Sequence, residues 1–118
     1  ALPNLAYHDY EGIALDLDER ERLVQDLGDK KALMLWNHGT LAVGETAAQC
    51  WMMIFYLERA CAIQVMASAQ GREHLRIAPD HAIETVKQQQ AIASGVGAML
   101  AWPGCLRKLD RESPGYDS

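Results

Sequence analysis

His38 is the side chain in this sequence whose type and position are best suited to chemistry. It stands between Asn37 and Gly39, directly after an apolar run over residues 31–36. A residue at the end of a buried strand can project from a rigid base into a cleft, and imidazole is the commonest metal ligand in proteins. The alternative is a loop histidine held by a backbone hydrogen bond. Because catalytic zinc usually takes three protein ligands, His38 alone does not make a metal site.

The remaining histidines do not supply the missing ligands. His8, His74 and His81 form no H-x-H or HExxH spacing with one another or with His38. We expect His8 at the edge of a strand and His81 exposed in the first turn of a helix. Neither is expected to bind a metal ion.

Glu58 is the second candidate, because it follows an apolar run over residues 50–57. A carboxylate in such a helix lies at a surface or is paired when buried. Arg59 points about 100° away from it around the helix, so the two need separate partners. Two interpretations stay open for Glu58: an ion pair at a helix surface or subunit interface, and a carboxylate that holds the turn around His38.

The elements that would position His38 follow from periodicity and capping signals. Alternation over 13–17 indicates a weak strand, and a helix of about ten residues begins near Asp18 and stops at Gly28. Residues 31–36 and 40–43 read as two strands of a hairpin with His38 at its tip. A long helix over 46–70 begins at the capping pair Thr46 and Gln49.

The second half of the chain is predicted to be mostly helical. Residues 74–77 form a short strand or a connector, and Pro79 suits the first position of a helix that Pro103-Gly104 ends. The apolar stretch 50–57 is too short for a membrane span, which needs about twenty residues. Such a helix needs more than one neighbour to bury it, so we expect burial against another subunit.

Composition narrows the class of protein. The chain has 118 residues, 49% of them hydrophobic, and a net charge of −5, which favours one folded domain and gives no basic footprint for nucleic acid or for an anionic membrane. Three widely spaced cysteines do not indicate a disulfide scaffold. We expect a cytoplasmic, reducing compartment. There is no visible signal peptide, and the missing initial Met fits processing, a trimmed chain or a fragment.

Two segments carry a resemblance to a known family. They are the run 35–44, LWNHGTLAVG, and the run 55–61, FYLERAC, which follows on the long helix. In combination they resemble the C-terminal half of the class II aldolase/adducin domain. Residues 10–15 and 102–110 are similar to its adducin-like bacterial branch, so the resemblance covers most of the chain.

The resemblance implies a fold and a chemistry. Family members are α/β/α layered domains around a largely antiparallel sheet, often tetrameric. The aldolases bind Zn²⁺ through three histidines, of which the last is the histidine of NHG, here His38. Zinc polarises the carbonyl of a small hydroxy-ketone, commonly phosphorylated, and stabilises the enediolate left by retro-aldol cleavage. Some members also use a C-terminal tyrosine, and Tyr116 lies in that region without a motif to assign it.

The chain departs from the family in length. A complete domain is about twice as long, and its H-x-H pair and acid/base carboxylate lie upstream of what residues 1–118 contain. We therefore expect a partial domain whose N-terminal half is absent, inactive alone and weak in zinc binding. Its parent would be a homo-oligomeric, zinc-dependent aldolase-type lyase acting on a small molecule. A non-catalytic adducin-like assembly domain is the alternative, and a small α/β binding module with a coincidental match is a third.

Overall fold

The described residues form a mixed α/β structure. The computed structural model describes residues 4–12 and 17–118, and the side chains of 91–94 are left aside. The elements in chain order are β1 (Leu5–His8), α1 (Glu19–Leu27), β2 (Ala32–Leu35), β3 (Gly39–Ala42), α2 (Ala47–Ser68), the short 3₁₀ helix η1 (Arg72–His74) and α3 (Asp80–Glu112). This confirms the predicted α/β class.

The sheet has the order β1-β2-β3 and joins two kinds of pairing. β1 is parallel to β2, with His8 opposite Leu35, and β2 is antiparallel to β3, with Leu35 opposite Gly39. Parallel neighbours need a crossover, which α1 provides. The expected hairpin is confirmed, whereas a largely antiparallel sheet is not visible in these three strands.

The first strand lies earlier than the sequence predicts. β1 covers Leu5–His8, so the predicted strand edge near His8 is right. The alternation over 13–17 falls mostly on residues 13–16, which lie outside the described residues.

The helix predicted near Asp18 is confirmed, and it begins at Glu19. Asp18 occupies the N-cap of α1, but its side chain makes no capping hydrogen bond. At the other end Gly28 takes a φ of 53° and donates its N–H to the carbonyl oxygen of Val24 at 3.1 Å. Glycine permits this turn because it has no Cβ.

The start of α2 follows its capping signal closely. Thr46 Oγ1 accepts from the Gln49 N–H at 3.3 Å, and Gln49 Oε1 accepts from the Glu45 N–H at 2.8 Å. The first bond satisfies a donor that the first helical turn leaves open, and the second satisfies the N–H of the residue before the N-cap. The helix ends at Ser68, two residues before the predicted end.

α3 does not end at Pro103, so that prediction is wrong. The helix runs through Pro103 to Glu112. Proline lacks the N–H that would bond the carbonyl four residues earlier, here that of Met99. Because Pro103 is exposed, water can reach the freed carbonyl group, and one interrupted bond does not stop a helix of 33 residues.

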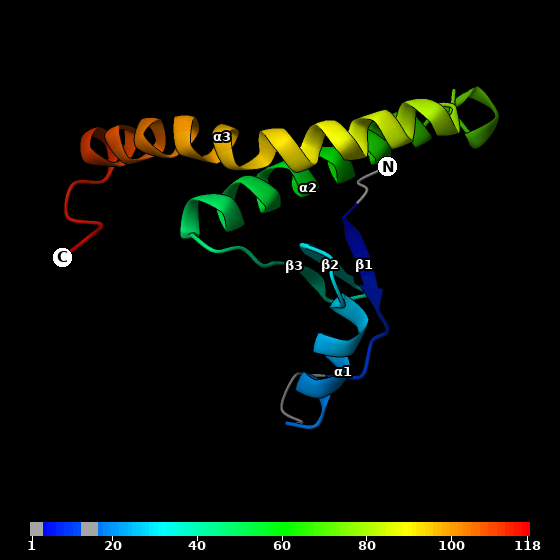
Figure 1. Cartoon of the computed structure of the whole chain (residues 1–118), viewed down its shortest axis with the longest axis horizontal. Helices are drawn as coiled ribbons and strands as arrows, with labels where there is room; N and C mark the ends of the chain where they lie inside the picture. Colours follow the sequence, from blue (N-terminus) through cyan, green and yellow to red (C-terminus); the bar gives the residue numbers. More distant parts are fainter. Residues whose placement is uncertain (1–3, 13–16) are drawn as a thin grey trace.

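α2 lies between the sheet and α3 (Figure 1) and contacts both. The apolar side chains that are buried among the described residues come from these layers: Ala32, Leu33, Met52, Leu57 and Ala98. A Cβ added at Gly97 would meet Met52 Cε at 3.9 Å. Small residues on α3 therefore let the two helices approach at this point.

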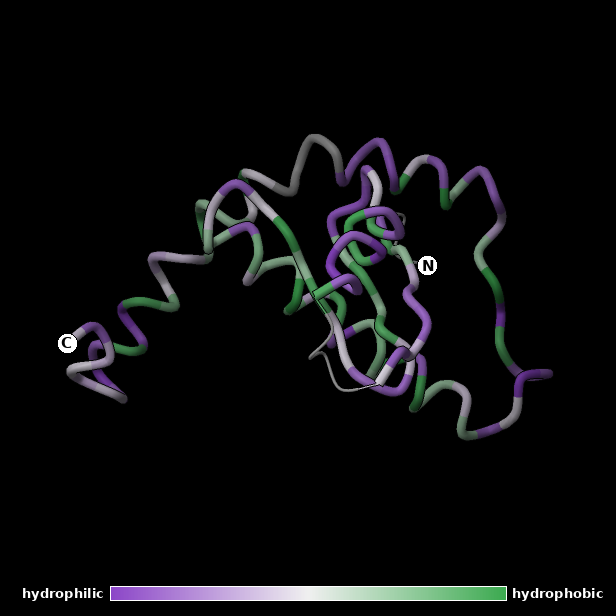
Figure 2. Tube along the Cα trace, turned by 90° about the horizontal axis from the view of Figure 1, so that it is seen from below, coloured by the Kyte–Doolittle hydropathy of each residue, from purple (hydrophilic) through white to green (hydrophobic). Residues whose placement is uncertain are grey.

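Much apolar surface stays outside this core. The radius of gyration is 16.8 Å, against about 13.5 Å for a compact domain of this length. Figure 2 shows hydrophobic residues recurring along the outstretched helices rather than gathering in one interior. On α2, Tyr56 is 57% exposed and Met66 is 67% exposed. The prediction that α2 needs further neighbours agrees with this exposure.

α2 also meets a length-and-composition criterion for a membrane span. It has 22 residues and few charges, and only 6% of its most apolar stretch is buried. The core helix of a soluble protein can meet the same criterion, and Glu58 and Arg59 interrupt α2 near its middle.

Replacing Leu33 tests the core. Leu33 on β2 is fully buried, with 0% exposed. Leu33→Ala is expected to lower the free energy of unfolding by about 2–5 kcal/mol, the range for deleting a buried leucine side chain. Leu100→Ala is the matched control, because Leu100 is 71% exposed. Denaturant titrations measure both, and equal losses would contradict this assignment of the core.

Candidate functional site

The turn between β2 and β3 carries His38 and is held by the strands on both sides. His38 donates its backbone N–H to the carbonyl oxygen of Leu35 at 3.2 Å. Asn37 has a φ of 55°, a left-handed conformation that asparagine tolerates better than most residues. The His38 side chain is exposed. The turn therefore presents an imidazole to solvent from a short, hydrogen-bonded loop.

The strand next to this turn supports it through aromatic and backbone contacts. The ring of Trp36 stacks on that of Tyr7, with 5.6 Å between centroids and 22° between planes. Trp36 also donates its N–H to the carbonyl oxygen of His8 at 3.0 Å. The end of β1 thus fixes the first residue of the turn.

Glu58 lies on α2 and reaches the strand that follows His38. Its Oε1 accepts a hydrogen bond from Thr40 Oγ1 at 3.2 Å; Glu58 is exposed and Thr40 is partly buried. Arg59 lies over the ring of Phe55 at 5.4 Å, so the two neighbours do have separate partners. Glu58 therefore links α2 to β3 two residues beyond His38. Its role in holding the turn stays a prediction.

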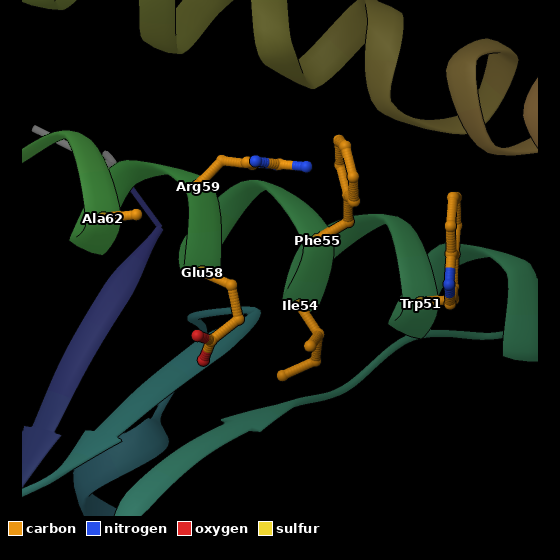
Figure 3. A pocket seen from close by; sticks show the side chains of 6 residues that line it. All are labelled: Trp51, Ile54, Phe55, Glu58, Arg59 and Ala62. Carbon is orange, nitrogen blue, oxygen red and sulfur yellow. The ribbon is translucent and has the colours of Figure 1, made fainter.

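An open groove of about 480 Å³ runs along α2 and does not include His38. Its lining is Trp51, Ile54, Phe55, Glu58, Arg59 and Ala62. Figure 3 shows Trp51 and Phe55 pointing toward α3, Arg59 extending along α2 toward Phe55, and Ile54 and Glu58 pointing toward the sheet. These side chains lie on two sides of one helix, so the groove is an uncovered helix surface rather than a closed pocket.

A much smaller cavity lies beside the turn. It measures about 10 Å³, and its lining includes His8, Glu11, Glu19, Trp36 and His38. This is room for about one water molecule. The structure thus brings His8 to the same cavity as His38, although sequence spacing gave no reason to pair them.

His8 makes contacts that the sequence did not indicate. It is 3% exposed, and its Nδ1 lies 2.7 Å from Asp26 Oδ2 on α1. Its Nε2 is buried without a hydrogen-bond partner in the part of the chain described. A buried polar atom left unpaired costs about 1–3 kcal/mol. No local motif signals this contact, because Asp26 lies eighteen residues further along the chain.

His74 and His81 are not arranged with other side chains of the described residues to bind a metal ion. His74 in η1 and His81 in the first turn of α3 are exposed, as expected for His81. Within residues 4–12 and 17–118, no three side chains of His, Cys, Asp or Glu are arranged to hold a metal ion. The residues described therefore do not by themselves fit a zinc ion, and His38 can contribute at most one ligand to a site completed elsewhere.

The remaining polar candidates have local roles in this structure. Cys50, Cys61 and Cys105 are free thiols. Tyr116 donates its hydroxyl to Asp110 Oδ1 at 3.4 Å. Partial desolvation, with the negative charges of Asp110 and Asp117, raises the pKa of Tyr116. The phenol therefore stays protonated at neutral pH and bonds within the C-terminal end.

The fold and the NHG turn define a small α/β domain with an exposed imidazole on its β2–β3 turn. Residues 2–65 match the family description "Class II Aldolase and Adducin N-terminal domain". The chain belongs to the class II aldolase/adducin family. The resemblance carried by 35–44 and 55–61 is thereby confirmed.

The relatives of this chain include proteins named as aldolases and proteins named as adducins. A "Putative aldolase class 2 protein" from Caulobacter vibrioides is 65% identical over 115 residues, which are 98% of this chain and 45% of that protein. Gamma-adducin from Homo sapiens is 35% identical over 92% of this chain and 17% of its own length. An aldolase II superfamily protein from Pseudomonas syringae has a crystal structure that superposes with a TM-score of 0.89 at 43% identity, over 98% of this chain and 47% of that one. The chain thus spans about half the length of the bacterial relatives.

The two glycines of the motif invite a paired test. A Cβ at Gly44 would lie 2.9 Å from Gln49 Cβ and 3.3 Å from the Cys50 backbone nitrogen, whereas a Cβ at Gly39 would meet nothing within 4 Å. Gly44→Ala is expected to lower the free energy of unfolding by about 1–3 kcal/mol through overpacking against the first turn of α2. Gly39→Ala, the control, is expected to change it by less than about 0.5 kcal/mol. Thermal unfolding compares the two, and an equally mild Gly44→Ala would refute the close approach.

Proposed function

We propose that this chain supplies one metal ligand, His38, to a zinc-dependent aldolase-type lyase of the class II family. The observation that carries the proposal is the exposed His38 imidazole on a hydrogen-bonded turn between paired strands, in a chain of this family. Substrates of the complete protein would be small hydroxy-ketones, commonly phosphorylated. Zinc would supply Lewis acidity at the substrate carbonyl.

The chain's own contribution is positioning. The left-handed Asn37, the Leu35 carbonyl and the pairing of β2 with β3 fix the backbone on both sides of His38. A ligand held this way loses little conformational freedom when it binds a metal ion. The other ligands and the acid/base group would come from residues outside this chain, so the chain alone would be inactive.

A non-catalytic, adducin-like assembly role is the second candidate. Adducins are among the relatives, at 44% identity over 64% of this chain for alpha-adducin from Mus musculus. The exposed apolar side chains of α2, such as Tyr56 and Met66, would serve assembly directly. Self-association, as a tetramer in many family members, and a cytoplasmic location belong to both candidates. Zinc in the complete protein separates them, because the assembly role predicts none.

Zinc titration of the 118-residue chain tests the ligand count. Since a single imidazole is a poor zinc site, isothermal calorimetry is expected to show binding weaker than low micromolar. Binding that is low micromolar or tighter would mean that these residues form a site of their own. His38→Ala provides the matched background for non-specific binding.

A second test uses a form of the protein that carries the complete family domain. His38→Ala is expected to lower bound zinc and lyase activity together. A site with three protein ligands loses most of its zinc affinity when one of them is removed. His74→Ala is the control, since His74 is exposed on η1 and is not a proposed zinc ligand. Metal analysis after dialysis measures the content. Unchanged zinc in His38→Ala would remove His38 from the ligand set, and zinc-free wild-type protein would favour the assembly role.

A further inference from the structure

His8 stands among acidic side chains from two parts of the chain. Asp26 and Glu19 come from α1, and Glu11 comes from the segment between β1 and α1. We call His8 with these three carboxylates the His8 cluster. The imidazole is 3% exposed and Glu19 is 6% exposed, so water screens their charges little.

Both ring nitrogens of His8 face carboxylate oxygens. Nδ1 lies 2.7 Å from Asp26 Oδ2, so it must donate a proton to that carboxylate. Nε2 lies 3.6 Å from Glu19 Oε1 and 3.8 Å from Glu11 Oε1. In a neutral ring bonded to Asp26, Nε2 would direct a lone pair at these two negative oxygens. A proton on Nε2 turns that repulsion into attraction.

Within residues 4–12 and 17–118, further charged or titratable groups near the ring include Arg22, Asp9 and His38. Arg22 on α1 binds the Glu11 carboxylate through its Nε at 2.8 Å. Asp9 and His38 line the same small cavity as His8. Among the described residues, the three carboxylates of the cluster outnumber the single positive charge of Arg22, and a proton on His8 reduces this excess of negative charge.

The backbone of His8 joins the cluster to the turn that carries His38. Its carbonyl oxygen accepts the Trp36 N–H at 3.0 Å, and His8 stands opposite Leu35 across the sheet. A residue that is tied to α1 by its side chain and to the turn by its backbone transmits the position of one to the other.

We propose that His8 is a buried imidazolium that fixes α1 and the segment 9–12 against the β2–β3 turn, and that it is a positioning residue for His38. The role concerns the geometry of the turn and holds whether or not His38 binds zinc. It is thus independent of the lyase proposal.

The protonation state gives the first test. Long-range ¹H–¹⁵N spectra of the uniformly ¹⁵N-labelled, unsubstituted chain at pH 7 are expected to show both ring nitrogens of His8 protonated. Assignment comes from the loss of the signals in His8→Gln. An Nε2 that lacks a proton, either free or bound to a metal ion, would overturn the proposal. If His8→Gln does not fold, the His8 signals of the unsubstituted chain can be assigned from through-bond correlations instead. The measurement therefore does not depend on a folded variant.

Amide exchange at the turn gives the second test. His8→Gln keeps a polar side chain but removes the charge, and Asp26→Asn removes the carboxylate with little change in shape. In each variant, hydrogen exchange of the Trp36 amide is expected to speed up by at least about tenfold. The free energy of a hydrogen bond to a charged group is typically larger than the free energy that corresponds to a tenfold change in an equilibrium constant. The resonances of the His38 ring are expected to move as well.

His74→Gln is the matched control for both variants. His74 also lies 3.6 Å from a carboxylate, that of Glu73, but its side chain is 64% exposed. It should leave the Trp36 amide and the His38 ring unchanged. If the His8 and Asp26 variants fold and leave them unchanged too, His8 does not position the turn.

Discussion

The surface of α2 is the constraint on which the rest of this structure depends. The helix is apolar on several sides, and it contacts the sheet through its inner face and α3 through another. Leu57 and Met52 are buried by these neighbours, yet Tyr56, Ile63 and Met66 remain more than half exposed. Burial of apolar surface contributes roughly 25 cal/mol per Å², so an uncovered helix face forgoes much of the stabilisation available to it. In relatives about twice as long, further chain is present that can cover such a face.

The sequence predicted elements best where local chemistry determines them. Thr46 and Gln49 start α2 because their side chains accept from backbone N–H groups at and just before the first turn, and Gly28 ends α1 because it accepts a positive φ. The hairpin followed from two apolar runs around Asn37 and His38. The prediction that α3 ends at Pro103 is wrong because it takes proline as a signal that stops a helix. In an exposed position of a long helix its missing hydrogen bond is a local cost that the turns on either side outweigh.

The candidate site divides in the same way. The NHG turn could be found in the sequence because its residues are adjacent and each has a local reason: Asn37 for the left-handed backbone, His38 for the imidazole, and the glycine at 44 for the close approach of α2. The His8 cluster could not be found, because it joins β1 to α1 across a segment whose length fixes no contact. The bond from Thr40 to Glu58 spans eighteen residues as well. Only the packing of α2 on the sheet brings that pair together.

The lyase and assembly interpretations place different demands on the chain, and the structure keeps these demands apart. Metal chemistry needs His38 exposed and held, and that depends on the β2–β3 turn and its link to His8. Assembly needs an apolar surface, and that lies on α2 at residues such as Tyr56 and Met66. Because neither feature uses the other's side chains, one can be lost while the other is kept. A family that holds both aldolase-named and adducin-named members is consistent with such independence.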